Sequence, residues 1–358
     1  MWAKIFGLVC ASLFMLVTAE AAPLAYVTNP NADTVTVIDI ATNTIVSAIP
    51  VGRRPLYLAA TPDGARLYVV NRGDMALDNR GSVSVIDTAT NTVVTDIALD
   101  IGFPFQIVLS PDGRRAYVAV SQGLGDVISG GANRVDVIDT ATNTVDASIT
   151  IPGDDPFGPM GLAITPDGRR LYVTNRGSGT LVEIDTETNT VTTSIPVSDS
   201  RPTGIAITPD GTRAYIANRG PDRSVMAFDI DPDSPTFRQL IAFVPVSFAA
   251  APVTFVGITP NGRRAYVTYT SSNRILVINT DPTSPFFNSP MQRIDTGAGA
   301  LSAVAFTPDG QRAYVASSYP NRVLVVDVNP ESEDFHTVIV TLTLGERDAF
   351  DVVIIPNR

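Results

Sequence analysis

Three repeated features of the sequence predict an all-β fold, a seven-bladed β-propeller with four-stranded antiparallel blades. Six Pro-Asp/Asn-Gly turns each lie between a short apolar run and an aromatic strand. Seven tyrosines recur at the same place in that strand, 42 to 55 residues apart. A third and a fourth short run of alternating apolar and polar residues follow each tyrosine. Four short strands repeated at this spacing are typical of propeller blades.

The turns connect the first and second strands of a blade. Proline presets φ for a turn, aspartate bonds the backbone two residues on, and glycine adopts the left-handed conformation. In one copy the apolar run 204–207 precedes the turn, and the aromatic strand 213–218 follows it, which predicts a hairpin. The six turns begin at Pro62, Pro111, Pro166, Pro209, Pro260 and Pro308.

The third and fourth strands are predicted at 83–87 and 93–97 in the second copy. Residues 88–92 connect them, with turn-forming side chains that hydrogen-bond their own backbone. The second-strand tyrosines count the blades: Tyr26, Tyr68, Tyr117, Tyr172, Tyr215, Tyr266 and Tyr314.

The two ends of the chain complete each other. The first blade has no inner strand before Tyr26, whereas residues 351–355 have an inner-strand pattern and Pro356-Asn357 resembles the start of a turn. We therefore expect one C-terminal strand to pair with three N-terminal strands. Such closure removes the exposed edges of an open array.

The N-terminus has the features of a secretory signal peptide over residues 1–21. Lys4 precedes an apolar stretch, 5–17, and Ala19-Glu20-Ala21 has the small-x-small pattern of a cleavage site. The propeller would then span 22–358, in the periplasm, secreted or at the cell surface. No second hydrophobic segment predicts a membrane span, and we expect a monomer.

The composition excludes several kinds of chemistry. The chain's only Lys, Trp and Cys (Lys4, Trp2 and Cys10) lie in the predicted signal, which leaves 24 Arg against 35 acidic residues. No thiol nucleophile or Schiff-base lysine is then available. One histidine, His336, cannot build a two- or three-His zinc site, and we expect no metal or cofactor. The acidic balance disfavours nucleic acid as a partner.

The repeat resembles a known family. The segments Pro-x-Gly-Ile-Ala-x-x-Pro-Asp-Gly, Tyr-Val-x-Asn and Val-x-Val-Ile-Asp-x-x-Thr-Asn-Thr are similar to the YVTN repeat of bacterial and archaeal secreted propellers. Residues 159–197 are the clearest copy, and the resemblance covers about 23–358. Similar proteins include surface-layer proteins, a periplasmic binder of single-stranded DNA, and lactonase-like enzymes. For the last group the resemblance implies a cleft with His, Glu and Arg, whereas this chain has one His.

Arginines and long loops indicate a binding face. The loops that follow second strands and precede first strands share one face, where segments 73–81, 121–134 and 152–160 are extended. Three second strands end in Asn-Arg-Gly, and two further arginines precede inner strands. We expect a positive channel mouth that binds carboxylate or phosphate. Alternatively, these arginines pair with acidic neighbours and order the loops. The candidate residues are Asn71, Arg72, Asn175, Arg176, Asn218, Arg219, Arg53 and Arg201.

Two other features are interpreted as structural. The alternating acids at 229–233 lack the glycine and distal glutamate of a calcium loop, and Asp229 matches the turn aspartate of other blades. His336 lies in a connection on the opposite face, and we expect it at the surface.

The sequence therefore predicts a non-catalytic, exported scaffold that binds a protein partner or a small anionic ligand through the arginine-bearing face. One alternative is a lactonase-like hydrolase using carboxylate and arginine in the central funnel. It requires a carboxylate with a raised pKa beside an arginine. A second alternative is a periplasmic binder of single-stranded DNA, with Phe103, Phe105, Phe157 and Tyr269 as stacking platforms.

Overall fold

The structure of the chain, a computed structural model, describes eight segments. They are residues 23–73, 80–122, 132–153, 157–197, 201–246, 252–297, 299–346 and 348–355. The predicted signal peptide lies outside them, as do parts of the three long loops. Within these segments, no helix is long and apolar enough to cross a membrane.

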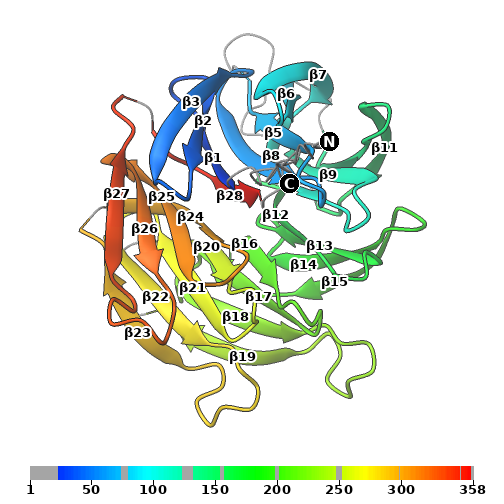
Figure 1. Ribbon diagram of the computed structural model, residues 1–358. Helices are drawn as coiled ribbons and strands as arrows, with labels where there is room; N and C mark the ends of the chain where they lie inside the picture. The colour runs from blue at the N-terminus through cyan, green and yellow to red at the C-terminus, as the bar shows by residue number, and fades with distance from the viewer. Residues whose placement is uncertain are drawn as a thin grey trace, which may run out of the picture.

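Seven four-stranded antiparallel sheets surround a central axis, which confirms the predicted fold class (Figure 1). Blade 1 consists of β28 (Val352–Ile355), β1 (Leu24–Asn29), β2 (Thr34–Asp39) and β3 (Thr44–Pro50). Blade 2 consists of β4 (Pro55–Ala60), β5 (Arg66–Asn71), β6 (Arg80–Asp87) and β7 (Thr92–Ile101), and blade 3 of β8 (Phe103–Leu109), β9 (Arg115–Ser121), β10 (Arg134–Asp139) and β11 (Thr144–Thr150).

The remaining blades follow the same order. Blade 4 consists of β12 (Pro159–Ile164), β13 (Arg170–Asn175), β14 (Thr180–Asp185) and β15 (Thr190–Pro196), and blade 5 of β16 (Pro202–Ile207), β17 (Arg213–Asn218), β18 (Ser224–Asp229) and β19 (Leu240–Pro245). Blade 6 consists of β20 (Val253–Ile258), β21 (Arg264–Tyr269), β22 (Arg274–Asn279) and β23 (Pro290–Asp295), and blade 7 of β24 (Gly299–Phe306), β25 (Arg312–Tyr319), β26 (Asn321–Asp327) and β27 (Val338–Thr343).

The C-terminal strand closes the ring as predicted. Strand β28 pairs antiparallel with β1, with Ile355 opposite Leu24 and Val352 opposite Val27. In Figure 1 the red β28 lies beside the blue β1. Closure therefore depends on hydrogen bonds and packing between the two ends of the chain.

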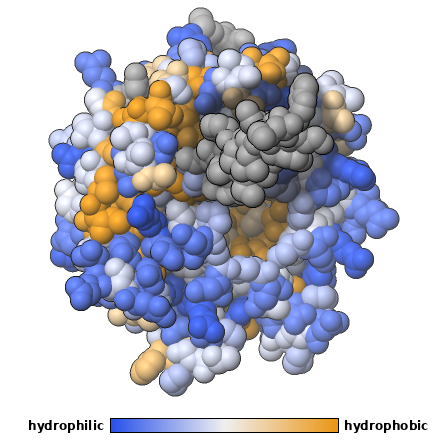
Figure 2. Space-filling view, viewed as in Figure 1, coloured by the Kyte–Doolittle hydropathy of each residue, from blue (hydrophilic) through white to orange (hydrophobic). Residues whose placement is uncertain are grey.

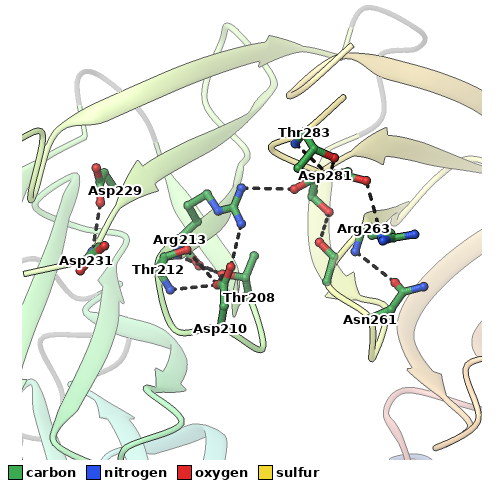
Figure 3. A network of polar contacts seen from close by, with 12 residues as sticks. Thr208, Asp210, Thr212, Arg213, Asp229, Asp231, Asn261, Arg263, Asp281 and Thr283 are labelled. Carbon is green, nitrogen blue, oxygen red and sulfur yellow. Dashed lines mark hydrogen bonds and ion pairs between the residues drawn. The ribbon is translucent and has the colours of Figure 1, made fainter. Parts of the chain in front are cut away.

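The Pro-Asp-Gly turns hold their shape through the residue before the proline. In blade 5, Thr208 donates its hydroxyl proton to Asp210 and accepts the N–H of Arg213 at 3.1 Å. Arg213 bonds Asp210 at 2.9 Å and also reaches the carbonyl of Thr280 in blade 6, at 3.3 Å (Figure 3). This arginine therefore joins its turn to the next blade. Equivalent arginines at 115, 170 and 312 bond carbonyls in their next blades.

The core lies between neighbouring blades, and the seven second-strand tyrosines are buried in it. Tyr68, for example, packs in one apolar cluster with Ile107 and Val118 of blade 3. In four blades the tyrosine donates a hydrogen bond of 2.6–2.8 Å to an asparagine of the next blade. The acceptors have φ between 53° and 56°, a left-handed conformation that asparagine tolerates. They are Asn91, Asn143, Asn288 and Asn43.

His336 occupies this asparagine position in blade 7, so the expectation of a surface histidine is wrong. Its side chain is 5% exposed and its φ is 64°. Nε2 lies 2.8 Å from the hydroxyl of Tyr266, and Nδ1 lies 2.8 Å from Oε1 of Gln292. Burial, together with the charge of Arg264, lowers the pKa of His336 to about 4. The ring is therefore neutral, with Nδ1 donating to Gln292 and Nε2 accepting from Tyr266.

The acids at 229–233 form a turn. Asp229 accepts hydrogen bonds from the hydroxyls of Ser234 and Thr236. Within the described segments no group of three His, Cys, Asp or Glu side chains could hold a metal ion. The carboxylates at this position therefore order the connection to the fourth strand.

Candidate active site

The inner strands of the seven blades line a cavity of about 330 Å³ on the axis. Each blade contributes the residue six positions before its turn proline, a geometric consequence of the shared strand register. Figure 2 shows hydrophobic residues near the centre of the ring, while hydrophilic residues cover much of the visible rim. The seven register-equivalent lining residues are Leu56, Phe105, Met160, Thr203, Thr254, Ser302 and Phe350.

Three of the candidate arginines line this cavity: Arg72, Arg176 and Arg219. They follow β5, β13 and β17, so equivalent positions in blades 2, 4 and 5 direct guanidinium groups to one site. The guanidinium carbon of Arg72 lies 5.2 Å from the ring centroid of Phe103 and 5.4 Å from that of Phe105. That of Arg176 lies 4.3 Å from the ring of Phe157. Such stacking fixes the guanidinium plane while its N–H edge can bind an anion.

Arg72 and Arg219 place partly buried positive charge beside the cavity. Burial lowers the pKa of Arg72 and of Arg219, and a neighbouring arginine, Arg54 or Arg201, lowers each further. Among the residues that the structure describes, neither Arg72 nor Arg219 forms an ion pair. Partly buried cations without a carboxylate partner favour an anionic ligand.

The candidate asparagines bind the protein itself. Asn71 donates to Ser84 Oγ at 2.8 Å, and Asn175 donates to the carbonyl of Pro152 at 2.8 Å. Asn218 Oδ1 accepts the N–H groups of Gly220, at 2.8 Å, and of Arg201, at 3.0 Å. All three are at most 1% exposed and anchor the loops that carry the arginines.

The other two candidate arginines, Arg53 and Arg201, lie near the site with exposed side chains, and neither lines the cavity. The carbonyl of Arg201 accepts the backbone N–H of Arg219 at 3.0 Å. The structure thus brings together three of the eight candidate residues, while the others support them or lie outside the cavity. Tyr269, one of the predicted stacking platforms, is buried and 5% exposed.

A carboxyl group that the motifs did not single out lies beside the cavity. Asp351 occupies the inner-strand position after Phe350, which lines the cavity. Its Oδ2 accepts the N–H of Leu58 at 3.1 Å, and its Oδ1 accepts that of Val352 at 2.9 Å. Burial raises the pKa of Asp351 to about 7, against the opposing effect of these two hydrogen bonds. A carboxyl with this pKa exchanges a proton near neutral pH.

Tyr57 connects Asp351 electrostatically to the arginines. Burial raises the pKa of Tyr57 above its usual range, the charge of Asp351 raises it further, and the charge of Arg219 opposes the rise. The ring of Tyr57 packs edge-on against Phe350, with 5.3 Å between centroids. Tyr57 and Arg219 line the cavity, whereas Asp351 does not line it and influences the phenol of Tyr57 through its charge. Asp351 thus has the raised pKa that the hydrolase alternative requires, and it shares the neighbour Tyr57 with Arg219.

A neutral residue at an equivalent position shows which part of the role of Asp351 is structural. Gln106 lies five residues before Pro111, as Asp351 lies five residues before Pro356. Its side-chain oxygen accepts the N–H of Leu162 in the next blade at 2.8 Å. An amide is thus sufficient for the bond between inner strands. The negative charge of Asp351 is additional to that bond.

The sequence could have revealed Asp351 through the incomplete repeat at the C-terminus. Aligning 351–355 with the other inner strands places an acid where they carry Tyr, Gln, Gly, Gly, Phe and Ala. Phe103, Phe105 and Phe157 were predicted as stacking platforms, whereas Phe255 and Phe350 gave no separate signal because an apolar inner strand has the same pattern whether it faces the core or the axis.

Comparison with known proteins gives a partial family match. Residues 106–246 match the family model described as lactonase, seven-bladed beta-propeller. No curated protein matches the chain. Among solved structures, hydrazine synthase of Kuenenia stuttgartiensis has a TM-score of 0.74 at 22% identity, covering 90% of this chain and 99% of that one. The periplasmic gluconolactonase of Pseudomonas aeruginosa has a TM-score of 0.74 at 17% identity, covering 94% and 99%.

A third similar structure, from Bacteroides uniformis, is described as a 6-phosphogluconolactonase; its TM-score is 0.71 at 16% identity, covering 94% of this chain and all of that one. The lactonase match corrects the prediction of a non-catalytic scaffold, which is wrong, and favours the hydrolase alternative. That prediction relied on the shortage of histidine and missed the buried carboxyl at the end of the chain. The chain is a seven-bladed β-propeller whose residues 106–246 are similar to lactonase propellers.

Proposed function

We propose that this protein is an exported, lactonase-like hydrolase that opens an anionic lactone in the axial cavity. The observation that carries the proposal is the convergence of Arg72, Arg176 and Arg219 on a site beside a carboxyl with a raised pKa. The match of residues 106–246 to the lactonase model supports it. Two of the structures that share the fold are described as gluconolactonases, which agrees with the proposal.

The arginines divide into two roles. Arg72 and Arg176 are held by phenyl rings and bind the anionic substituent of the lactone. Arg219, the guanidinium that influences Tyr57, donates to the lactone carbonyl oxygen. Negative charge develops on that oxygen as water adds, so a positioned donor stabilises the transition state more than the substrate.

Asp351 is the group that accepts the proton. Water adds to the carbonyl carbon and loses a proton to the Asp351 carboxylate. The acyl–oxygen bond of the ring then breaks, and the leaving alkoxide takes up the proton held by Asp351, which yields a hydroxy acid and restores the carboxylate. At neutral pH a carboxyl with a pKa near 7 is deprotonated in about half of the molecules, and its carboxylate is a stronger base than one with an ordinary pKa.

A hydrolysis assay tests the proposal. Purified protein is incubated with a panel of carboxylate-bearing and neutral lactones, and acid release is followed by pH-stat titration. We expect turnover of carboxylate-bearing lactones and a loss of about 10²–10³-fold in Arg219→Met, as for removal of an oxyanion donor. Arg114→Met is the matched control, because Arg114 lies beside a Pro-Asp-Gly turn with 85% of its side chain exposed. Equal rates in the two variants, or no turnover of any lactone, would refute the proposal.

We also propose the YVTN group of propellers as the specific relatives and the periplasm or cell surface as the location. The Tyr-Val-x-Asn strands and the similarity to a periplasmic gluconolactonase support this. N-terminal mass spectrometry of protein recovered from the cell envelope tests it. Cleavage after Ala21 is the expected result, and an intact Met1 in the recovered protein would contradict it.

A further inference from the structure

The walls of the axial cavity are mainly apolar and are rich in phenylalanine. Its described lining includes Phe103, Phe105, Phe157, Phe255 and Phe350, which come from four different segments. Tyr57, Met160 and Leu56 add further apolar surface. A ligand that fills about 330 Å³ must therefore place most of its body against phenyl rings.

Two hydroxyl groups of the wall are engaged within the protein. Thr203 Oγ1 donates to the carbonyl of Ala217 at 3.2 Å, and Ser302 Oγ donates to that of Ala316 at 3.2 Å. In the described residues, Thr254 Oγ1 is a buried hydroxyl without a hydrogen-bond partner. The lining therefore offers a ligand its guanidinium groups and the hydroxyl of Thr254, set in a wall that is mostly apolar.

These contacts are unfavourable for a polyhydroxylated ligand. Each sugar hydroxyl buried against a phenyl ring without a partner costs about 1–3 kcal/mol. A planar apolar ring, in contrast, packs against the phenylalanines and gains the free energy of burial. Arg72 and Arg176, whose guanidinium groups stack on rings, are placed to bind a carboxylate attached to such a body.

We propose that the axial cavity selects a carboxylate with an aromatic or similarly planar apolar body, and that its lactone substrate belongs to this class rather than to sugar lactones. The assignment of a lactone rests on the proposed function. The preference for an aromatic carboxylate rests on the cavity walls alone.

Calorimetric titration with two unreactive carboxylates tests the preference. The probes are 3-phenylpropionate and gluconate, which carry the same charge and differ in the body attached to it. We expect 3-phenylpropionate to bind at least tenfold more tightly. Phe157→Leu should weaken its binding by about fivefold to tenfold, because that ring contacts both cavity and guanidinium. Arg114→Met, on the exposed turn, should bind as the wild type does.

The outcomes separate this inference from the proposed function. Equal or tighter binding of gluconate, or no binding of either probe, would overturn the preference. Phenyl-selective binding without hydrolysis of any lactone would support the preference and refute the hydrolase proposal. Hydrolysis of gluconolactone without binding of 3-phenylpropionate would support the hydrolase proposal and refute the preference for an aromatic body. Should Phe157→Leu unfold, Phe105→Leu makes the same test at the lining phenylalanine beside Arg72.

Discussion

At the scale of single residues, the left-handed position before the fourth strand shows how different side chains perform one structural task. Asparagine accepts the tyrosine hydroxyl of the preceding blade in four places. His336 accepts it in blade 7. In blade 5 the position is Arg238, which instead holds Glu183, and Glu183 accepts the hydroxyl of Tyr172 at 3.0 Å. The requirement is an acceptor for a buried hydroxyl, so several residues satisfy it.

His336→Asn therefore replaces the histidine with the residue that serves elsewhere in the ring. The folded protein favours the neutral ring, because the pKa is lowered to about 4 from its usual 6.5. The contribution of His336 to stability is present above pH 6.5 and is lost as pH falls towards 4. We expect His336→Asn to change the free energy of unfolding by about 1 kcal/mol or less at pH 7, and to be less sensitive to acid than the wild type. Urea unfolding at pH 7 and 4.5 checks this; identical acid sensitivity in both proteins would contradict it.

The pH dependence of stability that we expect from Asp351 is the opposite of that expected from His336. Its pKa is raised from 3.8 to about 7, so the fold favours the protonated form. The contribution of Asp351 to the stability of the fold is therefore present below pH 4 and is lost as the pH rises through 7. Asp351→Asn should keep the bond to Leu58, as Gln106 keeps its bond to Leu162, and should become more stable than the wild type as pH rises. The expected gain at pH 8 is ~2–4 kcal/mol, since tenfold in proton affinity corresponds to about 1.4 kcal/mol.

Urea unfolding of both proteins from pH 4 to 8 measures this difference. A wild type that is equally or more stable than Asp351→Asn at pH 8 would show that the carboxyl is not destabilised by burial. The same charge that supports catalysis would then have no measurable cost to the fold.

At the scale of elements, closure by β28 is the feature on which the ring depends. Val352 and Ile355 are buried against blades 1, 2 and 7, and β28 hydrogen-bonds to β1. Without it, β1 becomes an exposed edge next to an unfilled gap. Burial of each of the two aliphatic side chains contributes about 1.5–3 kcal/mol.

A chain ending at Phe350 should therefore lose cooperative unfolding and aggregate, whereas one ending at Ile355 should behave as the full-length protein. Differential scanning calorimetry of the two truncations makes the comparison. A sharp transition near that of the wild type in the shorter chain would show that closure is dispensable.

The elements differ in how much the sequence revealed of them. The turns and strands were predictable because Pro, Asp and Gly specify local geometry and the copies repeat. The asparagines after the second strands were interpreted as ligand-binding, yet they anchor loops, because the same amide can face inwards or outwards. The positions of Arg72, Arg176 and Arg219 along one cavity were anticipated from their equivalent places. Phe103, Phe105 and Phe157 were predicted only as stacking platforms for nucleic-acid bases. Their stacking on Arg72 and Arg176 was not predicted, because contacts between blades do not depend on sequence separation.

At the scale of the whole molecule, the ring brings residues from distant repeats to one axial site. Arg219 of blade 5 and Asp351 of blade 1 both influence Tyr57 of blade 2. Histidine, the catalytic residue expected from related propellers, serves in the core instead. The proposed chemistry of the cavity therefore uses arginine and the carboxyl of Asp351.

The measurement that tests the account most directly is the pH dependence of kcat/KM for a carboxylate-bearing aromatic lactone such as 5-carboxyphthalide. For the wild type we predict a rise through pH 7 to a plateau, following ionisation of Asp351. In Asp351→Asn this rise should be absent, and kcat/KM at the pH of the plateau should be about 10²–10⁴-fold lower than in the wild type. The variant should remain folded. An unchanged profile in Asp351→Asn, or no enzymatic rate above the spontaneous hydrolysis, would contradict the assignment of the axial cavity as a lactone-hydrolysing site.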